Sequence, residues 1–229
     1  MEDSSVRKDE AKGGCKPMSD SIQPSPKNGS AAEPDATALI VTLQMDPAAA
    51  ARFTALRRQH FPAHRNWLDA HITLFHALPV GSVDLVLRDA QALASSTKPF
   101  GLRVDRVQFL GAGVAYALSS GPAVRLRSAL AERWSSLLGP QDRAKRGALH
   151  ITVQNKVPPA IARQLQGELE QVFEPHDIAA VGIQVWYYVG GPWRHAATFP
   201  LSGRRVGADD GDDGGRHPPG PTSVAAAPP

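Results

Sequence analysis

Two short segments of the chain repeat the same order of side chains. Residues 71–74 read His-Ile-Thr-Leu, and residues 150–153 read His-Ile-Thr-Val. Alternate side chains of a β-strand point to the same face. Each segment therefore predicts an imidazole and a hydroxyl side by side on one face of a strand, with aliphatic side chains on the other. This makes His71, Thr73, His150 and Thr152 candidates for joint chemistry.

A pair of imidazoles suits the opening of a 2′,3′-cyclic phosphate. The reaction needs a base that deprotonates water and an acid that protonates the leaving ribose oxygen, on opposite sides of phosphorus. One neutral and one protonated histidine can do both near neutral pH, where histidine titrates. The threonine hydroxyls can donate to the non-bridging phosphate oxygens. The scheme requires no metal or other cofactor, and it leaves open which histidine is the base.

An alternation of strands and helices must position the two motifs. Asp46 and Pro47 form a helix start, Ser82 is expected to cap a second helix, and aliphatic stripes predict helices near residues 126–137 and 161–172. Each half of the chain then reads strand, helix, strand, helix, strand, with one motif in its central strand. The expected strands are residues 38–43, 71–76, 102–110, 114–118, 150–154, 180–189 and 196–201.

The two ends of the chain differ from the middle. Residues 1–36 and 203–229 have almost no large apolar side chains, so we expect both to be disordered tails around one domain at residues 37–202. The single cysteine, Cys15, rules out a disulfide framework within the chain. The first thirty residues lack the apolar region of a secretory signal, and no apolar run is long enough to span a bilayer. We therefore expect a cytoplasmic protein.

The charge of the middle region favours an anionic substrate. Residues 37–202 carry 17 Lys or Arg and 11 Asp or Glu. Arg143, Lys145 and Arg146 lie just before the second motif and can guide RNA phosphates, although a solvated loop is the commoner interpretation of such a run. Surface charge also serves solubility, so this indication is weak.

The paired motifs resemble those of the 2H phosphoesterase superfamily, and within it the bacterial 2′-5′ RNA ligase and cyclic phosphodiesterase branch. The resemblance covers about residues 38–201. It implies a duplicated, bilobal α+β fold in which two mostly antiparallel sheets form a central cleft with helices outside. It implies hydrolysis of 2′,3′-cyclic phosphate ends, or reversible formation of 2′-5′ RNA linkages. The family's catalytic residues map to His71, Thr73, His150 and Thr152.

Three further residues are candidates for substrate binding. Phe75 and Gln154 lie four residues past each histidine and are expected on the same face, where Phe75 can stack on a base and Gln154 can form a hydrogen bond. Core packing is an equal alternative for both. Trp193 follows a Gly-Gly-Pro turn and is expected to line the cleft. His76, five residues past His71, is expected to point to the opposite face and to be structural.

The function indicated is a metal-independent phosphoesterase acting on RNA ends or nucleotides with a cyclic phosphate. We expect a monomer with no protein partner and no membrane association. One alternative is a binding module that holds RNA ends without turnover, although binding alone would accept Arg or Lys in place of histidine. A metal-dependent hydrolase is disfavoured, because the sequence holds no cluster of metal-ligating residues.

Overall fold

The computed structural model describes residues 35–144 and 149–203, so most of the two tails lies outside the described residues. The order of elements follows the predicted alternation, apart from the additional short helix α4. The strands are β1 (Ala38–Met45), β2 (Ile72–Leu78), β3 (Phe100–Phe109), β4 (Val114–Ser119), β5 (Leu149–Gln154), β6 (His176–Tyr188) and β7 (Trp193–Pro200). The helices are α1 (Pro47–His60), α2 (Val83–Ser96), α3 (Gly121–Arg133), α4 (Pro140–Ala144) and α5 (Pro159–Gln171), with 3-10 turns η1 (Ala63–Arg65) and η2 (Val80–Ser82).

All seven strands belong to one antiparallel sheet, in the order β1-β2-β5-β4-β3-β6-β7. β1 also pairs with β6, so the first six strands in this order form a closed ring and β7 extends from β6. The prediction of antiparallel strands with helices outside is confirmed, but the prediction of two separate sheets is wrong. The reason is β6, whose 13 residues pair with β1, β3 and β7 and so link both halves of the chain.

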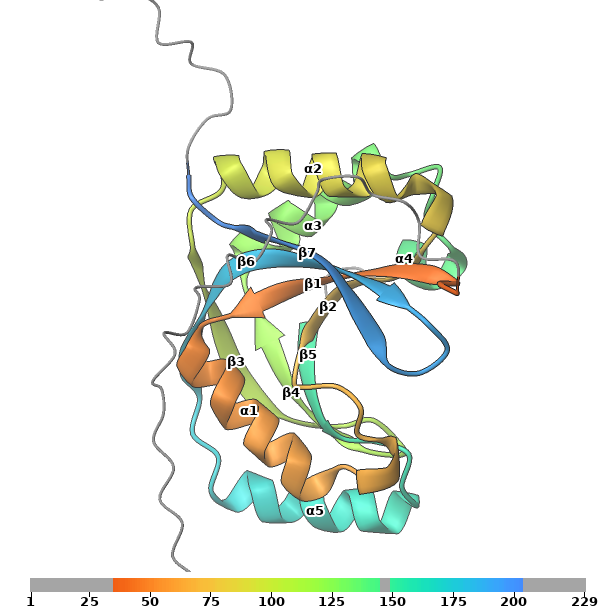
Figure 1. Ribbon diagram of the computed structural model, residues 1–229. Helices are drawn as coiled ribbons and strands as arrows, with labels where there is room; N and C mark the ends of the chain where they lie inside the picture. Colours follow the sequence, from red (N-terminus) through yellow and green to blue (C-terminus); the bar gives the residue numbers. More distant parts are fainter. Residues whose placement is uncertain (1–34, 145–148, 204–229) are drawn as a thin grey trace, which may run out of the picture. The chain divides into compact units, whose positions relative to one another are not determined.

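The helices lie in two groups on the outside of this sheet (Figure 1). α1 and α5 pack over β5, β4 and β3, while α2 packs over β6 and β7 and contacts α3. Asp46 caps α1 as predicted, because its Oδ1 accepts from the Ala49 N–H at 2.9 Å. Ser82 does not cap α2 with its side chain, because it ends the 3-10 turn η2. No helix of the described residues is long and apolar enough to cross a membrane.

The apolar stripe predicted for α5 is partly wrong. Its buried side chains are Ala162, Leu165 and Leu169, whereas Ile161 is half exposed and Val172 lies just beyond the helix with 78% of its surface exposed. The stripe predicted for α2 is confirmed, with Val83, Val86, Ala90 and Ala94 all buried. Both helices thus bury one face against the sheet, which holds the strands that carry the motifs.

The motif strand β2 contains a bulge. Thr73 and Phe75 pair with consecutive residues of β1, so Leu74 is an extra residue in β2. The same irregularity occurs in β5, where Val153 is the extra residue. Both bulges lie three positions past the motif histidine. A bulge moves the next side chains to the other face of its strand, which decides what the site contains. In β2 a second irregularity follows between Phe75 and Leu78.

Candidate active site

The two motifs lie against each other in the sheet. β2 and β5 are antiparallel neighbours, with Ile72 directly opposite Ile151. Antiparallel register places the residue before one isoleucine beside the residue after the other. His71 therefore lies beside Thr152, and Thr73 beside His150. The four polar side chains are half buried, while the two isoleucines are fully buried.

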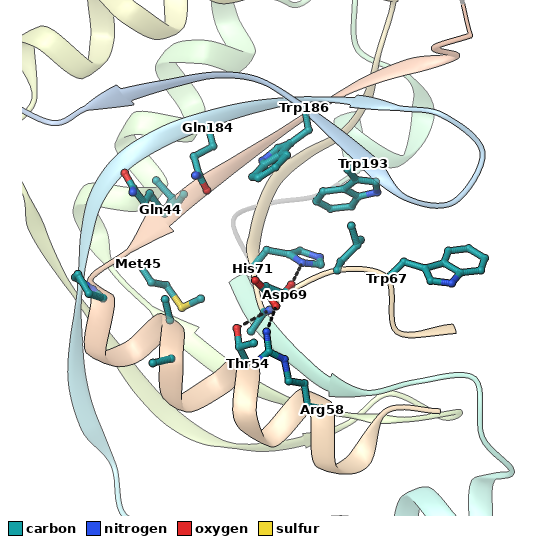
Figure 2. A pocket seen from close by; sticks show the side chains of 16 residues that line it. Gln44, Met45, Thr54, Arg58, Trp67, Asp69, His71, Gln184, Trp186 and Trp193 are labelled. Carbon is teal, nitrogen blue, oxygen red and sulfur yellow. Dashed lines mark hydrogen bonds and ion pairs between the residues drawn. The ribbon is translucent and has the colours of Figure 1, made fainter. Parts of the chain in front are cut away.

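The imidazole of His71 is held in one tautomer. Its Nδ1 lies 2.8 Å from the backbone carbonyl oxygen of Asp69. A carbonyl oxygen can only accept, so Nδ1 carries the proton and Nε2 presents a lone pair. Figure 2 shows this contact, with the ring of His71 at the wall of the cavity.

Burial is the main cause that lowers the pKa of His71 to about 4. The bond to Asp69 opposes this shift, and the positive charges of Arg57, His150 and His76 add to it. The ring is therefore neutral at physiological pH. The contribution of His150 also means that the two motif imidazoles lie within electrostatic reach of each other.

Arg57 is a buried cation beside the motifs that the sequence analysis missed. Its Nε donates to the Asn66 side chain and to the Leu68 carbonyl, both at 2.9 Å, and its Nη1 donates to the Thr152 carbonyl at 3.0 Å. Burial lowers its pKa to about 10, so the guanidinium remains charged at neutral pH. Arg57 thus ties the loop that leads into the first motif to the strand of the second.

A signal for Arg57 is present in the sequence. Ala49, Phe53 and Arg57 are four residues apart, and all three are buried on one face of α1. A positive charge at this spacing inside an apolar stripe demands polar partners. If the buried face of α1 had been assigned from this spacing alone, whatever the residue types, Arg57 would have been predicted to be buried.

Three tryptophans surround the site. The ring of Trp193 lies 4.5 Å from that of His71, centroid to centroid, and Trp186 lies 6.3 Å from Trp193. Trp67 is 59% exposed and packs over Gly191, where any larger side chain would collide with its ring. All three line a cavity next to His71. In Figure 2 the rings of Trp186 and Trp193 lie over it, while that of Trp67 points outward. Aromatic faces at a half-open site are suited to stacking on nucleic acid bases.

Two cavities meet at His71. One, of about 730 Å³, lies over β1 and α1 and is lined by Gln44, Gln184 and Trp186 among others. The second, of about 980 Å³, reaches Thr152, Arg57, Arg65 and Lys156. Both are bordered by Trp67, Leu68, His71 and Trp193. The described lining of the second cavity includes cationic side chains and no Asp or Glu, which suits an anionic ligand.

Comparison with known proteins places the chain in a family. Residues 45–192, which include both motifs, match the model of the 2′-5′ RNA ligase superfamily. The chain belongs to this superfamily. The resemblance to the 2H phosphoesterases is thereby confirmed. A search of curated proteins finds no match.

Solved structures related to this superfamily member support its fold. TT0787 of Thermus thermophilus is 15% identical, with a TM-score of 0.51, covering 72% of this chain and 98% of that one. A structure described as a phosphoesterase is 14% identical, with a TM-score of 0.50, covering 73% of this chain and 99% of its own. At these identities the likeness shows the fold alone.

Phe75 and Gln154 do not face the cleft. Their prediction as substrate-binding residues is wrong, and core packing, the alternative given for both, is correct. Phe75 is fully buried, with its ring 5.1 Å from that of Trp134 and the Arg127 guanidinium over its face. Gln154 is only 5% exposed, and its Oε1 has no hydrogen-bond partner within the described residues. The bulges at Leu74 and Val153 explain both errors, because each turns the next side chain away from the motif face.

The bulge in β2, which turns Phe75 away from the cleft, turns His76 toward it. This histidine was expected on the face away from His71, but both line the same cavity. Trp193 lines the cavity as predicted. Of the basic run before the second motif, Lys145 and Arg146 lie outside the described residues, and Arg143 is exposed on α4. Residues 35–144 and 149–203 contain no group of three or more metal-ligating side chains.

Proposed function

We propose that the protein is a metal-independent phosphoesterase that hydrolyses 2′,3′-cyclic phosphate ends of RNA or nucleotides with His71 and His150 as catalytic residues. The observation that carries the proposal is His71: a neutral imidazole with its Nδ1 proton bound to a carbonyl, beside the strand of a second His-Ile-Thr motif. That state is the one required of a general base.

In the proposed mechanism, Nε2 of His71 takes a proton from water as its oxygen attacks phosphorus. The bond between phosphorus and one ribose oxygen breaks, and that oxygen takes a proton from the imidazolium of His150. The product is a phosphomonoester beside a free ribose hydroxyl, and the two histidines have exchanged protonation states. Transfer of one proton through solvent restores the starting state.

Thr73 and Thr152 are proposed to bind the phosphate. The antiparallel register of β2 and β5 supports this, because it sets each threonine beside the opposing histidine. From there a hydroxyl can donate to a non-bridging oxygen that gains charge during the attack. Arg57 and Lys156 supply positive charge to the cavity, and Trp193 offers a face for a base. The same site can join a cyclic phosphate end to a 5′-hydroxyl when that hydroxyl replaces water, which gives a 2′-5′ linkage.

A module that binds RNA ends without turnover is the second candidate. Its support is the aromatic and cationic lining of the two cavities, which needs no chemistry to hold a nucleotide. It does not account for the fixed tautomer and lowered pKa of His71, because a phosphate is held better by a protonated ring.

The test is incubation of the purified protein with 2′,3′-cyclic nucleotides in EDTA, with products separated by chromatography. The proposal predicts a 2′- or 3′-nucleoside monophosphate that accumulates with time and enzyme concentration. Binding without product formation would favour the second candidate. Product that forms only after metal is restored would contradict the metal-independent mechanism.

A further inference from the structure

A third histidine faces the cleft. His76 lines the same cavity as His71 and Thr152, with 31% of its side chain exposed. Its charge is one of the causes that lower the pKa of His71, so the two rings lie within electrostatic reach. The paired-histidine mechanism gives this residue no role.

A buried carboxylate fixes the ring of His76. Oδ1 of Asp142 lies 3.0 Å from Nδ1 of His76, and the Asp142 side chain is only 1% exposed. The Asp142 carboxylate also accepts from the backbone N–H groups of His76 and Ala77 at 3.0–3.1 Å. Burial alone would raise the pKa of Asp142, but these hydrogen bonds hold it below the ordinary value. The carboxylate is therefore ionised and can only accept, so Nδ1 of His76 carries a proton.

Arg127 holds the backbone of Asp142 in place. This buried side chain of α3 donates from Nε to the Leu74 carbonyl at 3.2 Å and from Nη2 to the Asp142 carbonyl at 2.6 Å. The bulge of β2 and the helix α4 are thus joined through one guanidinium. Because Nδ1 of His76 is bound to Asp142, the remaining ring nitrogen, Nε2, is the one available to a ligand in the cavity.

We propose that His76, oriented by Asp142, binds the phosphate group in the cleft, with Nε2–H of its protonated ring donating to a non-bridging oxygen. The inference deepens the proposed function and rests on it, since it assigns His76 to the phosphate bound between the two motifs. A carboxylate-oriented imidazolium gives a short, charge-assisted hydrogen bond to an anion. The contact should be strongest for a dianion, such as the phosphomonoester product near neutral pH.

Several charged groups surround His76. Asp142 on α4 and Arg127 on α3 contact its own strand, and Arg57 on α1 lies in the same cavity. His71, just before β2, and His150 on β5 are the neighbouring histidines, and Lys156 and Arg65 add charge at the rim. The effect of His76 must therefore be separated from that of the motif histidines, which a variant at position 76 alone can do.

Sulfate is a suitable probe because it remains a dianion across the range in which histidine titrates. Its affinity for the full-length protein is measured by calorimetry at about pH 6 and about pH 8, on either side of the histidine range. His76→Gln keeps an amide donor near the position of Nε2 but cannot take up a proton. His176→Gln is the matched control, since His176 lies half buried at the start of β6 and lines neither cavity.

We expect His76→Gln to weaken sulfate binding about tenfold at the lower pH, the worth of one charge-assisted hydrogen bond. At the higher pH the loss should be less than about threefold, because that pH lies above the range in which histidine side chains ordinarily titrate. His176→Gln should match the wild type at both. Equal sulfate affinity of His76→Gln and the wild type at the lower pH would overturn the proposal, whatever the turnover of the wild type.

A second measurement, on the wild type, tests the proposal even if His76→Gln does not fold. The ring nitrogens of His76 in the wild type are followed by NMR against pH, with and without sulfate. Sulfate should raise the pH at which His76 loses its proton, because the anion stabilises the imidazolium. An unchanged titration would overturn the proposal. A protein that binds sulfate through His76 but does not open cyclic phosphates would refute the proposed function instead.

Discussion

The chemistry proposed for this protein depends on the protonation of one side chain, His71. Its bond to the Asp69 carbonyl leaves Nε2 as the acceptor, and burial keeps the ring neutral. A base with a pKa of about 4 is weak in the empty cleft. Binding of an anionic phosphate raises the pKa of a nearby imidazole, so the substrate itself would bring His71 closer to the value that suits a general base.

The first prediction concerns the acid side of the pH profile. His71 acts only when neutral, so activity should fall as pH drops through its pKa. The profile of kcat/KM reports the free enzyme and should fall near pH 4, the value given by burial. The profile of kcat reports the bound state and should fall at higher pH, because the substrate anion raises the pKa. Both are measured by initial rates on a cyclic nucleotide. An acid limb of kcat/KM at or above the ordinary histidine value would refute the role of His71 as the buried base.

The second prediction concerns the threonines. Thr73→Val and Thr152→Val keep the β-branched shape of the strand and remove one hydroxyl donor each. We expect kcat to fall about tenfold to a hundredfold for either variant, somewhat less than for a backbone oxyanion donor. Thr97→Val, at the end of α2 and outside both cavities, is the control. Unchanged kcat in both motif variants would show that the hydroxyls do not contact the reacting phosphate.

At the residue scale, sequence alone predicted the residues whose placement depends only on alternation along a strand. His71 and Thr152 line the cleft as expected from that alternation, and Trp193 lines it as expected from its place after the Gly-Gly-Pro turn. Phe75 was misplaced because one extra residue, Leu74, reverses the alternation. Arg57 was missed because the partners that make a buried arginine favourable lie far from it in the chain.

At the scale of elements, α4 is fastened to the motif strand. Asp142 satisfies the backbone N–H groups of His76 and Ala77, where the register of β2 with β1 shifts a second time, and Arg127 bonds to both elements. A bulge leaves ladder groups unpaired, so such an element needs partners from outside the sheet. The short sequence of α4 gives little signal for a helix, and the sequence analysis accordingly placed a loop there.

The third prediction tests this attachment. Asp142→Ala should lower the free energy of unfolding at neutral pH by about 2–4 kcal/mol, because it leaves buried N–H groups without an acceptor. The pKa of Asp142 is lowered in the folded protein, so its contribution is present above the ordinary value of 3.8 and is lost as pH falls through the folded value. The difference from the wild type should therefore shrink below about pH 4.

Asp69→Asn is the control for this measurement. Asp69 pairs with Arg58 at 3.2 Å, but both side chains are more than 70% exposed. An exposed pair of this kind contributes at most about 1 kcal/mol. Denaturant unfolding of the three proteins across pH gives the comparison. Equal stability of Asp142→Ala and Asp69→Asn would show that the buried carboxylate does not hold the bulge.

At the scale of the whole molecule, the alternation of elements was predictable but the closure of the sheet was not. Apolar periodicity reports whether a segment is a strand or a helix, and it placed both motifs in strands. Closure depends on β1 pairing with β6, which joins residues about 140 positions apart. Nothing in the pattern of either strand specifies that partner, so two separate sheets were as compatible with the sequence as one ring.

The fourth prediction concerns the domain proposed at residues 37–202. A chain of residues 35–203 should retain the stability and activity of the full chain, because the removed segments are poor in apolar side chains. A chain that ends at Pro200 should be less stable. It loses the buried Leu201 and the bonds from the Ser202 and Gly203 N–H groups to the carbonyls of Ala94 and Thr97. Thermal unfolding compares the three chains, and a lower midpoint for residues 35–203 would show that a removed segment contributes to the fold.

The central claim is that His71 and His150 act as one catalytic unit without a metal. The most direct test is the rate of cyclic nucleotide opening in EDTA for the wild type, His71→Ala, His150→Ala and the double variant. Each single replacement should reduce kcat by about a thousandfold or more, and the double should lose less than about tenfold beyond that, because groups that act as a unit are not additive. Near-full turnover in either single variant, or losses that multiply in the double variant, would contradict the account.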